Sequence, residues 1–345
     1  MSFSLNVDAD RWRAHADAVR KDVPDLVPVA KGNGYGFGMA TLAAESQRLE
    51  CATIAVGQID EVSSVHDAFR GDVLVLTPWH PAIDAAVPTD ERLIVTAGHR
   101  ESLRALAATN TRVVVELLTS MRRFGLDEEA LSQSLRDVTD LRLAGFALHL
   151  PLDADSASRV DEVSTWVRTL RRFHLSTHNL WLSHIGGSDL AILRRRHPEA
   201  TFRPRIGTGL WLGAPDTYRA SATVLAVHPT HKGQRYGYRQ RKARSDGQLM
   251  IMSGGTSHGV ALSAPRSVTS MSARAKAAAI GGLEAGGRSL SPFHVGGKRR
   301  WFAEPPHMQV SLIWLPTDVV TPAVGSEVAV DVRMTTASFD RLVLR

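Results

Sequence analysis

Short apolar runs alternate with amphipathic segments over the first two thirds of the chain. Apolar residues recur at helical spacing in segments such as 101–108, 128–136 and 158–172, which predicts helices between the runs. Eight strands that alternate with helices predict a parallel (β/α)8 barrel rather than an open doubly wound sheet. The expected strands are residues 26–30, 52–56, 72–76, 92–95, 112–117, 141–147, 180–183 and 201–205.

The helical periodicity fades after about residue 220. Short apolar runs there are separated by Gly, Pro and Ser, which predicts a second, all-β domain. We therefore expect a barrel domain over residues 1–220 and a C-terminal β domain over 221–345. The segment 271–283 is compatible with a helical turn or with a loop of small residues. The expected strands of this domain are 224–227, 249–252, 309–315 and 327–332.

Composition and charge restrict the class of protein. Of the 345 residues 43% are hydrophobic and 22% charged, which is typical of a globular protein, and no apolar run approaches the roughly 20 residues that span a bilayer. A single cysteine and no evident signal peptide predict a cytoplasmic protein. Cys51 starts an apolar run, so we expect a buried structural thiol.

The net charge of +6 includes the basic runs 194–196 and 298–300. Neither run is interleaved with aromatic residues, so we expect no nucleic-acid partner and no membrane partner. Positive charge also suits a phosphorylated cofactor or an anionic substrate.

The strand expected at 26–30 ends at Lys31, which is followed by a turn rich in glycine and by a helix that starts near residue 39. A lysine at the mouth of a buried strand loses hydration and part of its proton affinity. It is then suited to form a Schiff base with an aldehyde cofactor. The alternative is a loop lysine that extends into solvent.

The segment 29–38 resembles the pyridoxal-phosphate (PLP) lysine segment of the alanine racemase family, whose members are fold-type III PLP-dependent enzymes. The resemblance assigns Lys31 to the cofactor lysine and Tyr35 to the tyrosine whose hydroxyl contacts the phosphate, whereas Phe37 replaces the usual histidine. It also implies a (β/α)8 barrel followed by a β domain, a homodimer with shared active sites, and no metal.

Two further residues follow from the resemblance. The segment 119–126 is similar to a family turn in which Arg123 matches the arginine that helps to hold the substrate carboxylate. Its alternative is a solvated loop arginine. Glu116 stands where the family often carries a carbamylated lysine, and its anionic side chain would orient Arg123.

The remaining cofactor residues are expected at the ends of later strands. His149 matches a family histidine close to the cofactor ring, although a packed histidine is the alternative. Ser188 would donate to the phosphate and also cap the following helix. Arg205 matches the arginine that faces the pyridine nitrogen, and Gly207 and Thr208 would offer backbone amides, or a hydroxyl, to the phosphate.

The chain departs from the family in the second domain. The family's second catalytic base is a tyrosine, and Thr256 stands at that position. A threonine hydroxyl is not a base near neutral pH, so we expect His258, or Lys31 acting alone, to replace the tyrosine.

The resemblance thus predicts a PLP-dependent amino-acid racemase, an isomerase that interconverts L- and D-alanine or the enantiomers of a related amino acid. Two alternatives remain open. The chain either binds PLP without racemase activity, in a cofactor-holding or regulatory role, or catalyses another PLP reaction on an amino acid.

Overall fold

The structure is a computed structural model, and its chain divides into two compact units. One unit contains residues 13–34 and 38–214, and the other contains residues 1–12, 35–37 and 215–345. The structure describes residues 2–262, 271–272, 274–275, 278, 281–282 and 289–345.

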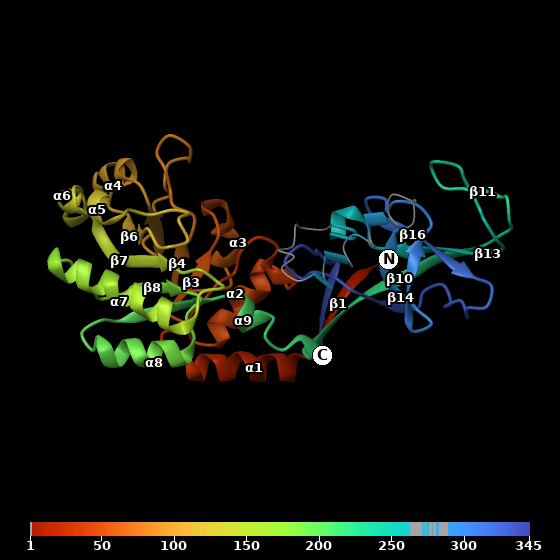
Figure 1. Cartoon of the computed structure of the whole chain (residues 1–345), viewed down its shortest axis with the longest axis horizontal. Coiled ribbons are helices and arrows are strands. Elements are labelled where there is room, and N and C mark those ends of the chain that lie inside the picture. The colour runs from red at the N-terminus through yellow and green to blue at the C-terminus, as the bar shows by residue number, and fades with distance from the viewer. Residues whose placement is uncertain (1, 263–270, 273, 276–277, 279–280, 283–288) are drawn as a thin grey trace. The chain divides into compact units, whose positions relative to one another are not determined.

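The first unit is the barrel (Figure 1). Its eight strands are all parallel to their neighbours, in the order β2-β9-β8-β7-β6-β5-β4-β3, and a bridge between Val29 and Ala55 closes the ring. Every strand overlaps its expected range, so the predicted barrel is confirmed. The strands are β2 (Val27–Pro28), β3 (Thr53–Val56), β4 (Asp72–Val75), β5 (Leu93–Ala97), β6 (Arg112–Leu117), β7 (Arg142–His149), β8 (Leu180–Ser183) and β9 (Phe202–Ile206).

The expected helices also form, with one correction. Residues 128–136 form two short helices rather than one, because the backbone leaves helical geometry at Ser134, which follows the C-cap Gln133. The side-chain oxygen and the carbonyl of Gln133 accept hydrogen bonds from Arg100. The helices are α1 (Ala9–Asp22), α2 (Met39–Arg48), α3 (Ser63–His66), α4 (Arg100–Ala107), α5 (Glu128–Ser132), α6 (Leu135–Thr139), α7 (Ser156–Arg172), α8 (Gly187–Arg196) and α9 (Thr208–Trp211).

The interior of the barrel is a packed apolar layer. Inward-facing residues from successive strands fill it, as is usual for a closed barrel of eight strands. Because this core is sealed, chemistry is confined to the two ends of the barrel. The layer consists of Val27, Val29, Ala55, Leu74, Ile94, Val114, Ala147 and Trp181.

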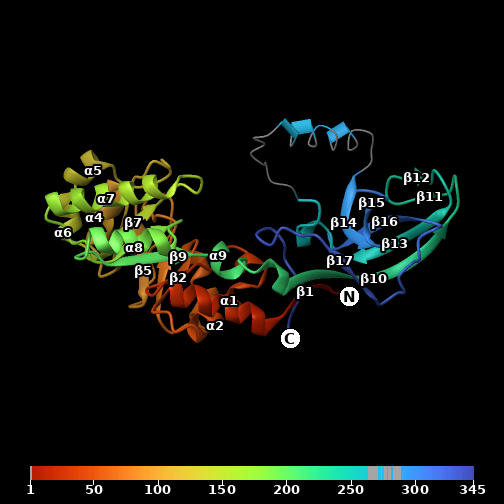
Figure 2. The ribbon, with the colours of Figure 1, turned by 60° about the horizontal axis from the view of Figure 1, so that its bottom comes forward.

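The second unit is an all-β domain (Figure 2). Its main sheet has the order β13-β16-β15-β14-β17-β10-β1-β18, with an additional pairing of β13 with β10. The strands are β1 (Phe3–Val7), β10 (Tyr218–Thr230), β11 (Arg235–Tyr236), β12 (Arg241–Lys242), β13 (Gly247–Ser253), β14 (Leu290–Val295), β15 (Lys298–Phe302), β16 (Val310–Pro316), β17 (Glu327–Val330) and β18 (Arg341–Leu344).

The two units differ from the expected domains, 1–220 and 221–345, at the N-terminus. The first strand, β1, pairs antiparallel with β10 and parallel with β18, so the first residues of the chain complete the β domain. The expected boundary at residue 220 falls inside β10. Part of the segment 271–283 lies outside the described residues.

Two features bear on the class of protein. Cys51 is buried, and burial raises the pKa of its thiol to about 11, which agrees with a structural rather than a nucleophilic role. In the described part of the chain, no helix combines the length and the apolar character that crossing a membrane requires.

Candidate active site

The glycine-rich turn converts a barrel strand directly into helix α2. The amide of Ala30 still pairs with the carbonyl of Ala55, and the amide of Gly34 then donates to the carbonyl of Lys31 at 3.1 Å. Gly34 has φ +61°, and a Cβ at this position would lie 2.6 Å from the backbone nitrogen of Met39. Only glycine fits here, so the turn holds Lys31 at the carboxyl end of the first barrel strand.

Lys31 lies in an electropositive environment. Its side chain is exposed at the end of the barrel, yet loss of hydration, and then the charges of Arg123 and Arg205, lower the pKa of its amino group. The Glu61 carboxylate opposes this shift. A lowered pKa increases the fraction of neutral amine, which is the form that attacks an aldehyde.

Glu61 is a residue that the sequence did not single out. Its carboxylate accepts hydrogen bonds from the amides of Gly32 and Gly57, at 2.8 and 2.7 Å, and so ties the turn after Lys31 to the loop after β3. No motif marks this glutamate, because its role depends on a contact between residues 29 positions apart.

Arg205 and Glu116 form the buried floor of the site. Both side chains are at most 5% exposed. Burial raises the pKa of Glu116 and lowers that of Arg205, while the charge of each opposes the shift of the other, so the two groups stabilise each other's ionised forms. The Nη2 group of Arg205 donates to the carbonyl of Leu148 at 3.1 Å.

The Nε–H of Arg205 is a buried donor that has no partner within the described residues. A buried donor without a partner costs on the order of 1–3 kcal/mol. The pyridine nitrogen of PLP is an acceptor that would satisfy such a donor. The residues therefore fit the cofactor, because its ring nitrogen would give the buried Nε–H of Arg205 the acceptor that it lacks.

Arg123 follows β6 on an exposed loop, where its guanidinium lies over the ring of Phe124 at 5.4 Å. Its charge acts on Lys31, Glu116 and His149, so it belongs to the same cluster. An exposed guanidinium beside a buried positive cluster is suited to receive a carboxylate from solvent.

His149 ends strand β7 and lies against His184, with ring centroids 5.2 Å apart. Burial first, and then the charges of Arg205 and Arg123, lower the pKa of His149 to about 3. The imidazole is therefore neutral at physiological pH, and its flat, uncharged ring can pack against an aromatic cofactor.

This shift predicts a pH dependence of stability. The folded pKa of about 3 lies below the ordinary 6.5, so between these values the unfolded chain binds a proton at His149 that the folded chain does not. We expect the free energy of unfolding to fall as pH drops through this interval, and to fall less in His149→Gln. Urea denaturation at several pH values measures it. The exposed His178 supplies the control, His178→Gln, and equal slopes in both variants would contradict the assignment.

The expected phosphate residues lie at the ends of β8 and β9. A cavity of about 580 Å³ is lined by Gly186, Gly187 and Ser188 together with Ile206 and Gly209, and also by Val19 and Asp22 of helix α1 and by Val23, which follows that helix. One expectation is corrected here, because Gly186 rather than Ser188 is the N-cap of α8, so the Ser188 hydroxyl is not the cap.

Gly207 is the N-cap of the short helix α9 and Thr208 is its first residue. Both therefore lie directly after strand β9, next to two residues of that cavity, Ile206 and Gly209. Backbone amides at this position are suited to an anionic group.

Tyr35 and Phe37 belong to the unit that contains the β domain. Tyr35 is buried and has φ 53°. Phe37, which replaces the family histidine, stacks on Trp12 at 4.6 Å and meets Tyr218 edge-on at 5.6 Å. The replacement therefore has a packing role within this unit.

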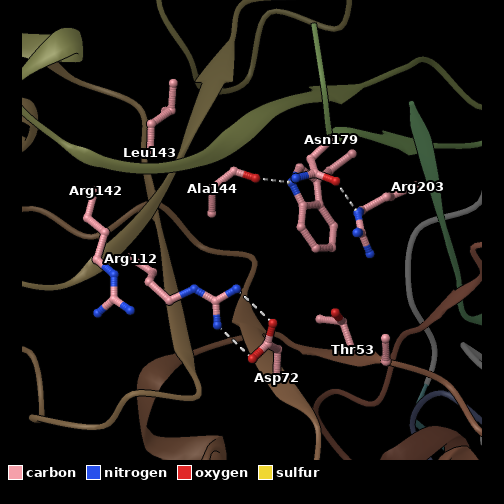
Figure 3. A pocket seen from close by; sticks show the side chains of 10 residues that line it. Thr53, Asp72, Arg112, Arg142, Leu143, Ala144, Asn179 and Arg203 are labelled. Carbon is pink, nitrogen blue, oxygen red and sulfur yellow. Dashed lines mark hydrogen bonds and ion pairs between the residues drawn. The ribbon is translucent and has the colours of Figure 1, made fainter. Parts of the chain in front are cut away.

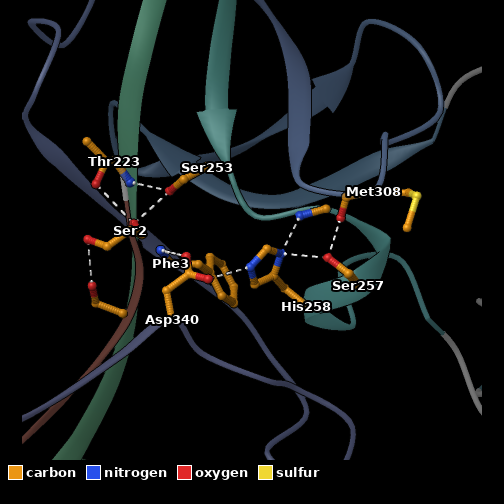
Figure 4. Close-up of polar contacts among 10 residues, drawn as sticks. Ser2, Phe3, Thr223, Ser253, Ser257, His258, Met308 and Asp340 are labelled. Carbon is orange, nitrogen blue, oxygen red and sulfur yellow. Dashed lines mark hydrogen bonds and ion pairs between the residues drawn. The ribbon is translucent and has the colours of Figure 1, made fainter.

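His258 is held on both sides of its ring (Figure 4). Its Nδ1 accepts from the amide of Gly255 at 3.2 Å, and its Nε2 lies 3.0 Å from Oδ1 of Asp340. The proton is therefore on Nε2. For His258 to act as a base, Nδ1 must exchange its bond with Gly255 for one with a substrate. Thr256 lies in the same turn and is exposed.

Taken together, the barrel presents one amine, two guanidinium groups, two carboxylates and two imidazoles at the carboxyl ends of its strands. This set suits an aldehyde cofactor with an anionic group and a substrate with a carboxylate. Within the described residues, no group of three or more His, Cys, Asp or Glu side chains is placed to hold a metal ion.

Comparisons with known proteins agree with this chemistry. A family model described as "Alanine racemase, N-terminal domain" matches residues 7–215. The chain is 26% identical over 267 residues to an alanine racemase from Nitratidesulfovibrio vulgaris (strain DSM 19637 / Miyazaki F), covering 69% of this chain and 72% of that protein.

Solved structures share the fold. The alanine racemase from Bartonella henselae, with covalently bound pyridoxal phosphate, superposes with a TM-score of 0.71 at 16% identity and 100% coverage of both chains. The histidine racemase from Leuconostoc mesenteroides subsp. sake NBRC 102480 superposes with a TM-score of 0.63 at 18% identity, covering 95% of this chain and 87% of that one.

Proposed function

Because this chain belongs to the alanine racemase family, whose members use PLP, we propose that it interconverts the L and D enantiomers of an amino acid. The observation that carries the proposal is the cluster around Lys31: an amine of lowered pKa close to Arg205, whose buried Nε–H has no partner among the described residues. Lys31 is the residue that holds the cofactor.

PLP supplies an electron-withdrawing ring that makes the α-hydrogen of a bound amino acid acidic. The residues of this chain determine the fate of that hydrogen. Arg205 would donate to the ring nitrogen, and because a guanidinium stays charged it does not pass its proton on, which keeps the ring a moderate electron sink. That favours return of the proton to the same carbon over side reactions.

The phosphate is proposed to lie against Ser188, Gly207 and Thr208, with Tyr35 as a further donor. Arg123 would bind the substrate carboxylate, and the Glu116 carboxylate would balance the charge of Arg123 and Arg205 beneath it. His149 would pack as a neutral ring against the cofactor.

Racemisation requires a proton to leave one face of the α-carbon and return to the other. We assign one face to the Nζ of Lys31 and the other to His258, supplied by the second subunit of a homodimer. Asp340 accepts from His258 Nε2, so it would stabilise the protonated ring. If His258 does not take part, Lys31 is the base on both faces.

The substrate is not fixed by the family. The similar proteins include an alanine racemase and a histidine racemase by name, and the turn at Thr256 differs from the family tyrosine. We propose alanine as the first candidate and test related amino acids beside it.

The test is exchange of the α-hydrogen with deuterium from solvent, followed by proton NMR over a panel of amino acids, with chiral chromatography of the products. Exchange with formation of the opposite enantiomer supports racemisation. Bound PLP without exchange of any amino acid supports the alternative, a protein that holds PLP without turnover. Absence of bound PLP would contradict both.

We expect His258→Gln to lower the rate of racemisation by about 10²-fold or more, because it removes a positioned acid–base group. Asp340→Asn tests the support of the imidazole and should cause a smaller loss together with a shift in the pH profile. Gln234→Ala, in an exposed turn of the same domain, serves as the control. Full racemisation by His258→Gln would leave Lys31 as the base on both faces.

A further inference from the structure

A second cavity lies at the end of the barrel where the strands begin, whereas Lys31 lies where they end. Figure 3 shows its lining side chains. It has a volume of about 290 Å³ and is lined by residues at the amino ends of β3, β4, β6, β7, β8 and β9. Three of these are arginines: Arg112, Arg142 and Arg203. Lys31 and the proposed cofactor residues of the barrel lie at or near the carboxyl ends of the strands, so the length of the strands separates this cavity from them.

The floor of the cavity is closed by Trp181, which is part of the apolar layer inside the barrel. Its indole Nε1–H donates to the carbonyl of Ala144 at 3.3 Å. Ala144 is an extra residue in strand β7, because Val113 pairs with Leu143 whereas Val114 pairs with Gly145. This bulge turns the Ala144 carbonyl toward the indole and fixes the floor.

The same bulge positions one of the arginines. Gly145 has φ +130°, and a Cβ there would lie 2.1 Å from the carbonyl oxygen of Asn179, so the two backbones are in close contact. The side-chain Oδ1 of Asn179 accepts from Nε of Arg203 at 2.6 Å. The guanidinium of Arg203 lies over the Trp181 ring, 5.1 Å from its centroid. Arg203 is thus held from two directions.

One arginine of the cavity, Arg203, has no carboxylate partner among the described residues. Arg112 makes a two-pronged ion pair with Asp72, at 2.6 and 2.8 Å, and Arg142 donates through Nη1 to Glu91 at 2.7 Å. Asp72 is the one acidic residue among the lining residues, against three arginines. Within the described chain, the Nη atoms of Arg203 and the Nη2 of Arg142 have no hydrogen-bond partner.

We infer that this cavity binds a phosphate group, either free inorganic phosphate or the phosphate of a small monoester. Arg203 and Arg142 keep guanidinium N–H groups without a protein partner among the described residues, and a tetrahedral dianion offers enough acceptor oxygens for both arginines. The volume is near the lower limit of small-molecule sites, which excludes a large ligand. The stacked and hydrogen-bonded Arg203 is the main anchor, and Arg142 is a second donor at the rim.

This inference does not depend on the proposed function. It concerns residues that take no part in holding PLP, and it is measured by binding rather than by turnover. To fill any phosphate position near Lys31, the protein is first saturated with PLP and freed of excess cofactor.

The test is isothermal titration calorimetry of this protein with inorganic phosphate and, separately, with glycerol 3-phosphate. Arg203→Gln should weaken phosphate binding by about tenfold or more, and Arg142→Gln should weaken it by a smaller factor, since each removes charged donors. Arg171→Gln is the matched control. Arg171 is an exposed arginine on the outer helix α7, and it forms an ion pair with Glu199. Tighter binding of the monoester than of phosphate would identify the monoester as the ligand.

Equal phosphate affinity in wild type and Arg203→Gln, or no heat of binding to the wild type, would overturn the inference. Thermal unfolding of each variant shows whether a lost affinity reflects a lost fold. Arg142 is exposed enough that Arg142→Gln should fold normally, so it decides the question if Arg203→Gln does not.

Discussion

Lys31→Ala is expected to lower the rate of racemisation by about 10³-fold or more, because one amine is proposed to hold the cofactor and to move a proton. The variant should also lose the visible absorption of protein-bound PLP. After reduction with borohydride, mass spectrometry should find the cofactor on the peptide that contains Lys31 in the wild type and not in the variant. This second measurement reports attachment independently of turnover.

Lys31→Arg is the informative control for this result. It keeps the positive charge close to Glu61, so the turn should remain folded, but a guanidinium does not replace the amine as a nucleophile. A second control, Lys21→Ala, removes an exposed lysine in the last turn of α1. Cofactor attachment and turnover that persist in Lys31→Ala would show that another residue holds PLP.

The barrel could be predicted from the sequence because the residues that specify each strand and each helix lie within that element. Each buried parallel strand is a short apolar run bounded by turn residues, and each surface helix carries its own periodicity. The segment 128–136 reads as one continuous helix, although its backbone leaves the helix at Gln133 and Ser134, where Gln133 accepts a hydrogen bond from Arg100, 33 positions earlier. Such a contact leaves no periodic signal.

The first strand also depends on contacts between residues far apart in the sequence, which a local pattern does not reveal. Residues Phe3–Val7 form β1, whose partners are β10, more than two hundred residues later, and β18 at the C-terminus. A single short strand becomes stable only when its sheet is present, so the sequence alone assigns these residues to the barrel domain. Strand pairing, rather than propensity, decides the domain boundary here.

The site could be predicted in part for a geometric reason. The carboxyl ends of parallel strands meet at one end of a barrel, so residues at or just after the ends of separate strands, such as Lys31, His149 and Arg205, are brought together. Glu61 and the arginines at the amino ends were missed. Their roles arise from backbone contacts and from a bulge, and neither can be predicted from the pattern of residues along the chain.

The buried pair of Glu116 and Arg205 gives the largest expected change in stability. Arg205→Met should lower the free energy of unfolding by about 1–3 kcal/mol, because the Glu116 carboxylate then stays buried without the largest of the charges that favour its ionised form. The comparison is Arg171→Met, which breaks the exposed pair with Glu199 and should cost about 0–1 kcal/mol. Urea denaturation of the cofactor-free protein measures both, so that lost PLP affinity does not add to the difference.

The double variant Arg205→Met with Glu116→Gln separates lost packing from lost charge balance. If the charge is the cause, removing Glu116 should restore part of the stability that Arg205→Met loses, and the two changes will not be additive. Equal and additive losses would contradict the coupling.

The same coupling fixes the sign of a pH effect. Burial already raises the pKa of Glu116 in the folded chain, and the loss of Arg205 raises it further. Where the folded pKa lies above the unfolded value, the folded chain binds more protons, so stability is highest below the unfolded pKa and falls as pH rises through the interval. Arg205→Met should therefore lose stability more steeply with rising pH than the wild type, whereas the double variant should not. A steeper loss toward low pH would mean that Glu116 is not the group left without a partner.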